Sequence, residues 1–209
     1  TAGGEAAFAT IAELKVFGAE ASDGGDNVTF YGVPTASVSA PQGGGNRDIA
    51  VICDGVSPAQ DCADTSRQYD TYFPGKTETV ESFGYTFPST VSIHKLVYQE
   101  GIHFENGGWF QGGSLRVEVR QNGEWQAVTL TNTPNYPVGN DLASFGASFE
   151  IYTFEFEPIT GDAIRIIGTA GGDAVFTNIA ELKVYGVING EPDSSPEPVP
   201  SFSTTPGPF

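Results

Sequence analysis

Residues 115–128 read LRVEVRQNGEWQAV, and this stretch decides the fold class. Apolar and polar residues alternate strictly from Leu115 to Arg120, which is typical of a strand with one buried face. An Asn-Gly pair follows at positions 122–123, which is the strongest short-range signal for a tight β-hairpin turn. A second short run begins at Trp125. The stretch therefore predicts an antiparallel hairpin, with the Trp125 ring in the core.

Other short apolar runs along the chain repeat this pattern. Residues 91–98, 152–157, 163–167 and 179–185 are rich in β-branched and aromatic residues, and turn-forming residues separate them. Residues 152–157 alternate, so their aromatic side chains are expected to face the core and their glutamates to face water. His94 lies inside an apolar run and is interpreted as structural. The pattern predicts an all-β sandwich.

The charge balance limits the classes of partner. The chain has 209 residues, with 9 Lys and Arg against 26 Asp and Glu, which gives a net charge of −17. Nucleic acids and anionic membranes need clustered cations, so this balance argues against both. No apolar run is long enough to cross a bilayer, so no membrane insertion is expected. The length fits one generous domain with appendages.

An internal repeat defines the domain map. Residues 1–18 read TAGGEAAFATIAELKVFG and residues 169–186 read TAGGDAVFTNIAELKVYG, identical at about 13 of 18 positions. The second copy closes a long module, so the first is interpreted as the closing strand of a preceding repeat or as a donated strand. The expected divisions are 1–19 for that strand, 20–27 for a linker, 28–189 for the module and 190–209 for a stalk rich in Pro, Ser and Thr.

The two cysteines suggest a location. Cys53 and Cys62 lie in one polar, turn-like stretch, and two such residues alone are too few for structural zinc. A disulfide that closes this loop is the favoured interpretation, with a reduced pair as the alternative. A disulfide would place the protein outside the cytoplasm, and the sequon at Asn27 points the same way. An extracellular protein, secreted or attached to a cell surface, is therefore expected.

Four landmarks in this order resemble the coagulation factor 5/8 type C (discoidin-like) domain. They are Asp54-Gly55 after an apolar run, the hairpin at 115–128, the strand at 161–166 and the closing strand at 179–186. More narrowly, residues 45–188 are similar to family 32 carbohydrate-binding modules. This resemblance implies a galactose-binding-like jelly-roll β-sandwich. The chain departs from the family pattern in the loop between its cysteines and in residues 99–110, so the sugar cannot be carried over.

The resemblance also implies a structural calcium ion, held between the loop after Asp-Gly and the glutamate of the closing strand. Calcium takes six to eight oxygen ligands, many of them backbone carbonyls. The candidate metal ligands are Asp54, Asp61, Asp64, Thr65 and Glu181. The alternative interpretation is a solvated acidic loop and a surface glutamate.

Two loops contain the mixture of aromatic and polar residues that binds sugars. Aromatic faces stack on sugar C–H groups, and directional polar groups fix the hydroxyls. The candidate ligand-binding residues are Arg67, Tyr69, Tyr72, Gln99, Glu100, His103, Phe104, Asn106, Trp109 and Phe110. The alternative is that Trp109 and Phe110 anchor the loop in the core, with His103 merely hydrogen-bonded.

These observations predict a non-catalytic carbohydrate-binding module of a secreted, multi-modular protein, calcium-stabilised and specific for a neutral glycan. Catalysis is disfavoured because Glu100 and Glu105 lie in one loop without a supporting motif. The alternative function is a structural surface or filament subunit, in which residues 1–18 add as a strand to a neighbouring copy. Contacts of Phe8 and Ile11 with a second chain would identify that homo-oligomer.

Overall fold

The computed structural model describes residues 25–60, 62–132, 136 and 149–189. The described strands are β1 (Asp26–Asn27), β2 (Val33–Ala36), β3 (Tyr69–Asp70), β4 (Val80–Glu100), β5 (Arg116–Gln121), β6 (Glu124–Ala127), β7 (Ile151–Thr169) and β8 (Asn178–Ile188). Three short 3-10 helices accompany them: η1 (Thr29–Tyr31), η2 (Ile49–Cys53) and η3 (Thr65–Arg67). Within these ranges no helix has the length and apolarity to cross a membrane. The expected strand at 1–19 and stalk at 190–209 lie outside the described residues, so both stay predictions.

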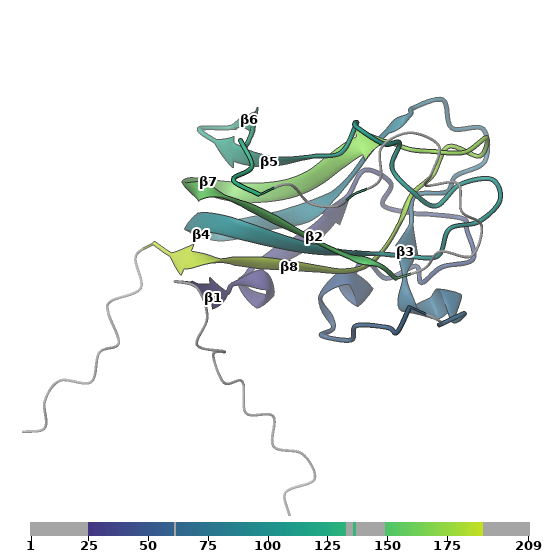
Figure 1. Cartoon of the computed structure of the whole chain (residues 1–209), viewed down its shortest axis with the longest axis horizontal. Coiled ribbons are helices and arrows are strands. Elements are labelled where there is room, and N and C mark those ends of the chain that lie inside the picture. The colour runs from purple at the N-terminus through teal and green to yellow at the C-terminus, as the bar shows by residue number, and fades with distance from the viewer. Residues whose placement is uncertain (1–24, 61, 133–135, 137–148, 190–209) are drawn as a thin grey trace, which may run out of the picture.

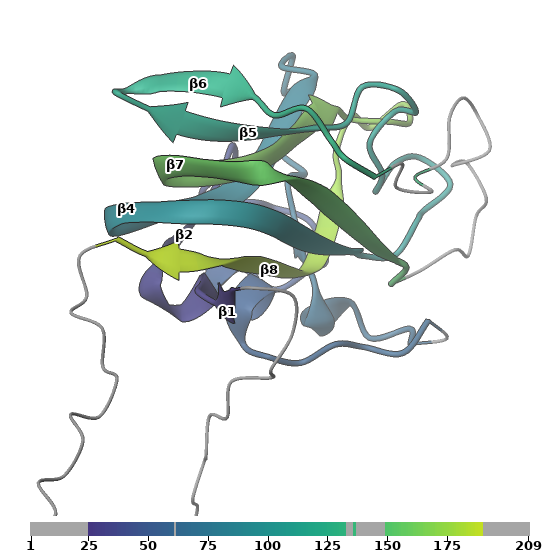
Figure 2. The same ribbon diagram turned by 60° about the vertical axis from the view of Figure 1, so that its left-hand side comes forward.

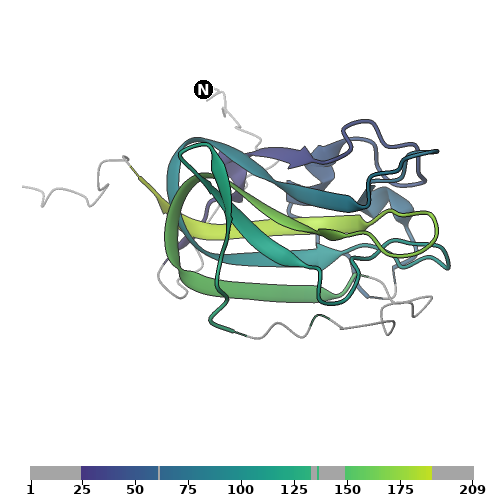
Figure 3. The same cartoon turned by 90° about the horizontal axis from the view of Figure 1, so that it is seen from above.

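The sheet runs in the order β1-β8-β4-β7-β5-β6, with β2 added to β4 and β3 added to β8. Every one of these strand pairs is antiparallel. Figure 2 shows this order from β6 down to β1. The long strands β4 and β7 bend and serve both layers of the fold, which curve around a common interior (Figures 1 and 3). Residues 83–86 of β4 pair with β2, whereas residues 91–100 pair with β8.

The bend in β4 has a local cause. The ladder to β7 shifts its register between Thr86 and Val91, and the residues between include the exposed Pro88. Proline has no N–H to give to a ladder, so it is tolerated at such an irregularity. Opposite Val91, β7 has Gly161, where an added Cβ would lie 2.3 Å from Val119. The strand therefore needs glycine there to pass close to β5.

The core between the layers is largely aromatic and includes Phe83, Tyr85, Leu96, Tyr98, Phe110, Val119, Ile164, Ile166, Leu182 and Val184. The Phe110 ring meets the Phe83 and Tyr98 rings edge-on, at centroid distances of 6.3 and 6.1 Å. As predicted, Tyr152, Phe154 and Phe156 are buried, while Glu155 and Glu157 are exposed. The predicted runs at 152–157 and 163–167 are two parts of the single strand β7.

The prediction that Trp125 lies in the core is wrong. Trp125 is half-buried and pairs across the hairpin with Arg120, on the outer face of the sheet. Val117 and Val119 occupy the inner face of β5, so the residues paired with Glu118 and Arg120 must lie outside. The guanidinium carbon of Arg165 lies 4.1 Å from the Trp125 ring centroid. Arg165 also donates to Glu118 at 2.6 Å.

Replacement of Glu118 by Gln tests this outer network. Burial raises the pKa of Glu118, but hydrogen bonds from Arg165 and Arg116 outweigh it and hold the pKa below its ordinary 4.5. The charged form therefore contributes stability above that pH, and the contribution is lost as the pH falls through the lowered pKa. Denaturant titrations are expected to show a loss of about 1–2 kcal/mol at pH 7 and a much smaller loss at pH 3. The matched control is Glu155→Gln, at an exposed position of β7. An equal loss at both pH values would contradict the assignment.

Candidate functional site

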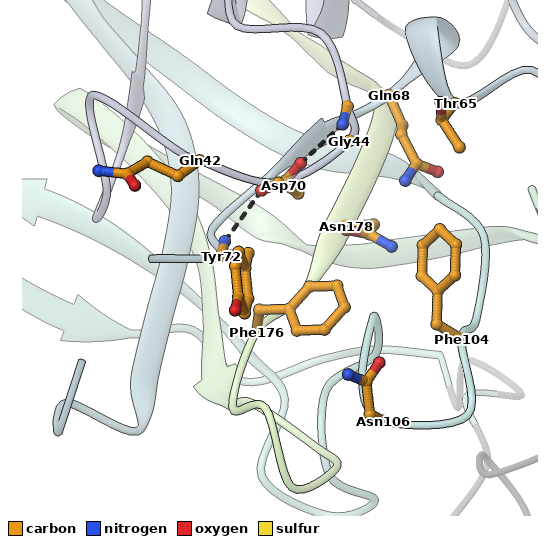
Figure 4. A pocket seen from close by; sticks show the side chains of 12 residues that line it. Gln42, Gly44, Thr65, Gln68, Asp70, Tyr72, Phe104, Asn106, Phe176 and Asn178 are labelled. Atoms are coloured by element: carbon orange, nitrogen blue, oxygen red, sulfur yellow. Dashed lines mark hydrogen bonds between the residues drawn. The ribbon is translucent and has the colours of Figure 1, made fainter. Parts of the chain in front are cut away.

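A cavity of about 480 Å³ lies at the end of the sandwich where β8 begins and β4 ends (Figure 4). Its walls come from η3, from the end of β3 and the residues beside it, from the start of β8, and from the loops at 42–45, 104–106 and 176. The lining residues are Gln42, Gly43, Gly44, Gly45, Thr65, Gln68, Asp70, Tyr72, Phe104, Asn106, Phe176 and Asn178. Binding pockets for small molecules in proteins have volumes of this order. The cavity is the candidate functional site.

Asp70 shapes one side of this pocket. Its carboxylate accepts hydrogen bonds from the backbone N–H of Gly45 at 2.9 Å and of Tyr72 at 3.0 Å. A Cβ added to Gly43 would lie 2.4 Å from both carboxylate oxygens. The loop can therefore approach Asp70 this closely only with glycine at position 43.

Two buried amide side chains hold the loop that follows β4. The N–H of Ile102 donates to Gln68 Oε1 at 2.7 Å, and the carbonyl of Ile102 accepts from Asn178 Nδ2 at 2.6 Å. Gln68 is 1% exposed and Asn178 is fully buried. We call this pair of contacts the Ile102 clamp. It fixes both peptide groups of one residue and thereby positions the rest of the loop.

One end of the clamp has no partner among the described residues. Asn178 Oδ1 is buried without a hydrogen bond. In Figure 4, Asn178 lies at the centre of the pocket residues, between Gln68, Phe104 and Phe176. The clamp thus leaves one unpartnered acceptor, Asn178 Oδ1, next to the pocket, and buried polar groups of this kind normally have partners.

Three aromatic rings line the pocket opposite the clamp. The Phe176 ring lies 5.6 Å from Tyr72 and 6.1 Å from Phe104. The backbone at Gly107 packs directly against the Phe176 ring: a Cβ built on Gly107 would lie only 2.5 Å from that ring. Tyr72 and Phe104 are half-buried, so part of each ring is open to a ligand.

The pocket brings together part of the residue set expected from the sequence. Tyr72, Phe104 and Asn106 line it, and Thr65, which was expected at the metal site, lines it too. Arg67 is not among the lining residues; it is half-exposed at the end of η3, with its Nε 3.5 Å from Asp64.

The other expected ligand-binding residues lie in the core. Tyr69 donates its hydroxyl to the Val38 carbonyl, and Gln99 donates to the carbonyls of Pro58 and Phe149. Phe110 is fully buried, and Trp109 is 7% exposed. The structure places Phe110 and Trp109 in the core, which is the alternative that the sequence left open.

His103 and Glu100 form a buried pair behind the pocket. His103 Nε2 lies 3.0 Å from Glu100 Oε2, and the two side chains are 2% and 0% exposed. Burial raises the pKa of Glu100, and the His103 contact opposes that rise. The His103 ring packs on Trp109 at 5.5 Å between centroids. Neither residue is placed to touch a ligand in the pocket.

The pocket also contains residues that sequence reasoning missed: Gln42, Gly43, Gly44, Gly45, Gln68, Asp70, Phe176 and Asn178. A signal existed for some of them. The three consecutive glycines at 43–45 indicate a close backbone approach, and Gln68 and Asp70 stand in the same polar and aromatic loop as Tyr72. Asn178 stands at the start of an apolar strand, where nothing local distinguishes it.

Comparisons with known proteins identify the fold. No family model matches the sequence, and no curated protein matches it. The structure matches CpGH89CBM32-5 from Clostridium perfringens at a TM-score of 0.51 and 17% identity, over 74% of this chain and 95% of that one. It matches the family 32 module of NanJ from Clostridium perfringens at 0.50 and 16% identity, over 75% and 94%. A chain of the Streptococcus pneumoniae β-galactosidase BgaA matches at 0.54 and 12% identity, over 74% and 90%.

The chain has the fold of the family 32 carbohydrate-binding modules. The predicted discoidin-like, all-β jelly-roll sandwich is confirmed. Because these identities lie far below 25%, the likeness concerns the backbone, and ligand choice must be argued from this chain's own residues.

The glutamate of the closing strand fits the cation expected for the family 32 fold. Glu181 is 3% exposed, and its Oε2 is buried without a hydrogen-bond partner among the described residues. Its pKa is raised to about 8: burial raises it most and Asp54 adds to the rise, while Lys183 and the Gly55 backbone oppose it. A cation between Glu181 and Asp54 would relieve both the burial of charge and the repulsion.

Two other members of the expected metal set have other roles: Asp64 caps η3 and accepts from the Ser66 N–H at 3.0 Å, and Thr65 lines the pocket. Asp61 lies outside the described residues. In the described ranges no group of three or more His, Cys, Asp or Glu side chains is placed to hold a metal ion. A cation beside Glu181 would therefore take most of its ligands from backbone carbonyls, which calcium accepts.

The predicted disulfide is not formed. Both Cys53 and Cys62 are free and half-buried. Cys53 ends η2, and its Sγ donates to the Ala50 carbonyl of the preceding turn at 3.4 Å. The thiol therefore faces its own helical turn, which is why nearness of the two cysteines in the sequence did not produce a bond.

Alkylation tests the state of the cysteines. Protein purified without reductant is expected to take up two carbamidomethyl groups from iodoacetamide, as counted by intact mass. Cys53 is expected to react more slowly than a model thiol, because burial, Glu181 and Asp54 raise its pKa and reduce the thiolate fraction. Modification that appears only after reduction would show that Cys53 and Cys62 are joined by a disulfide in solution.

Proposed function

We propose that the chain is a non-catalytic carbohydrate-binding module that binds a neutral glycan in the pocket beside the Ile102 clamp. The observation that carries this proposal is the combination of half-buried aromatic rings at Tyr72 and Phe104 with a buried, unpartnered acceptor on Asn178. Sugars have C–H faces that pack on aromatic rings and hydroxyls that hydrogen-bond to amides. The aromatic side of the pocket therefore suits the C–H face of a sugar, and the amide side suits its hydroxyls.

The charge of the pocket favours a neutral glycan. Asp70 is the one charged residue among those that line it, and its carboxylate already accepts two backbone hydrogen bonds. No Lys or Arg stands among the lining residues to neutralise a uronate or sialate. Similar folds support a sugar ligand: CpGH89CBM32-5 was solved with GalNAc-β-1,3-galactose and the NanJ module with galactose.

Binding without catalysis is supported by the positions of the carboxylates. Glycosidases need two carboxyl groups about 5–10 Å apart across a cleft. Glu100 is fully buried and paired with His103, whereas Glu105 is exposed on the following loop. One substrate could not touch both. The module would instead hold a larger protein at its glycan, and further modules on that protein would add avidity.

A structural calcium ion beside Glu181 and an extracellular location complete the proposal. The unpartnered buried oxygen of Glu181 supports the ion. The location is supported by the glycan ligand, because the free cysteines remove the disulfide as an argument for it.

A glycan array tests the proposed ligand. The wild-type protein is expected to bind neutral glycan termini and not those that end in sialate or uronate. Phe104→Ala is expected to lower the affinity for any hit at least tenfold, or about 1.4 kcal/mol, because it removes a wall of the pocket. The matched control is Phe73→Ala, since Phe73 is 42% exposed and does not line the pocket. Silence on all neutral glycans from folded protein would overturn the proposal.

Thermal unfolding tests the calcium ion. At a hundredfold excess over the dissociation constant, calcium is expected to raise the melting temperature by about 5–10 °C over protein in chelator. Glu181→Gln is expected to abolish this response. Asp64→Ala, which removes the side-chain cap of η3, is expected to lower stability but to keep the response. Equal melting temperatures of wild-type protein with calcium and with chelator would exclude the ion.

A further inference from the structure

The internal repeat can be placed on the structure position by position. Residues 169–186 run from the end of β7 through a loop into β8, and residues 1–18 share most of their sequence. Several shared residues have strict structural roles. A Cβ on Gly171 would lie 2.0 Å from Trp109 Nε1, and Gly172 has a φ of +73°. The first copy has glycine at both corresponding positions, Gly3 and Gly4, so its sequence meets the same two requirements.

The differences between the copies fall into two groups. Asp173, Val175 and Tyr185 correspond to Glu5, Ala7 and Phe17, and all three are exposed or half-buried. At the buried positions of residues 169–186, the core residues and Glu181 are identical in both copies. The buried residues that differ are the neighbours Thr177 and Asn178, which correspond to Ala9 and Thr10.

Asn178 lines the pocket, and Thr177 is the residue before it. Asn178 supplies one half of the Ile102 clamp and one unpartnered acceptor. The backbone N–H of Thr177 donates to Thr71 Oγ1 at 3.0 Å. A threonine at position 178 is shorter than asparagine and has no amide to reach the Ile102 carbonyl; it replaces the amide with a shorter hydroxyl and a methyl group. The change keeps a strand-forming residue and alters the pocket.

We propose that positions 177 and 178 determine which glycan the pocket accepts, and that residues 1–18 encode the β8 segment of a second module with the same core and a different ligand. The inference rests on the proposed carbohydrate-binding function. Asn178 acts as a specificity-determining and positioning residue: it fixes the loop that carries Phe104 and Asn106, and it offers an acceptor beside them.

Three variants of the full chain test this proposal by glycan array and thermal unfolding. The first replaces residues 169–186 with the sequence of residues 1–18. The second carries only T177A and N178T. The third carries only D173E, V175A and Y185F and serves as the matched control. All three are expected to fold, with melting temperatures within about 10 °C of the wild type. The control is expected to keep the wild-type glycan profile, while the other two lose the wild-type hits at least tenfold.

Each outcome separates this proposal from the broader one. If wild-type protein binds glycans and the T177A/N178T protein binds the same set with unchanged affinity, the specificity assignment is overturned while the binding function stands. If the full exchange or the T177A/N178T protein fails to fold, residues 1–18 do not encode a β8 for this core, and the proposal fails. If folded wild-type protein binds no glycan, the binding function fails, and the specificity assignment fails with it.

Discussion

The antiparallel ladder between β4 and β7 is the constraint on which the rest of the structure depends. Both strands run through both layers, and they bend where their register shifts between Thr86 and Val91. Because one ladder continues around the bend, each layer fixes the position of the other. The loop after β4 and the loop between β7 and β8 are thereby brought to the same end of the sandwich, where they form the pocket.

At that end, stability and ligand binding depend on the same buried amides. Gln68 and Asn178 are almost completely buried, and an unpaired amide in such a place costs free energy. One end of each side chain satisfies a peptide group of Ile102. The Oδ1 of Asn178 has no partner in the described residues, so a ligand that donates to it would supply the missing hydrogen bond. The clamp acts together with the backbone bonds Phe104 N–H to Gly107 O and Ala174 N–H to Asn106 O, which also hold this loop.

The sequence predicted the fold well because the decisive signals are local. Strand alternation and the Asn-Gly turn involve residues that are neighbours in the chain, and both the hairpin and the closing strand are present. Trp125 was misplaced because alternation shows that two faces differ without showing which face the first residue of the next strand takes. The site was predicted only in part, since its partners are distant: the Ile102 contacts join residues 34 and 76 positions apart. A polar, glycine-rich loop likewise does not show that His103 and Trp109 point inward.

The pairing of β1 with β8 has a mechanical consequence. Asp26 lies opposite Gly186, so the module's chain enters and leaves at neighbouring points, at the end away from the pocket (Figures 1 and 2). A pull on the two connecting segments loads the short β1–β8 pairing first and breaks its hydrogen bonds one after another, as a zipper opens. The β4–β7 ladder and the pocket lie beyond this point. Under tension the β1–β8 pairing therefore breaks before the loops that line the pocket are disturbed.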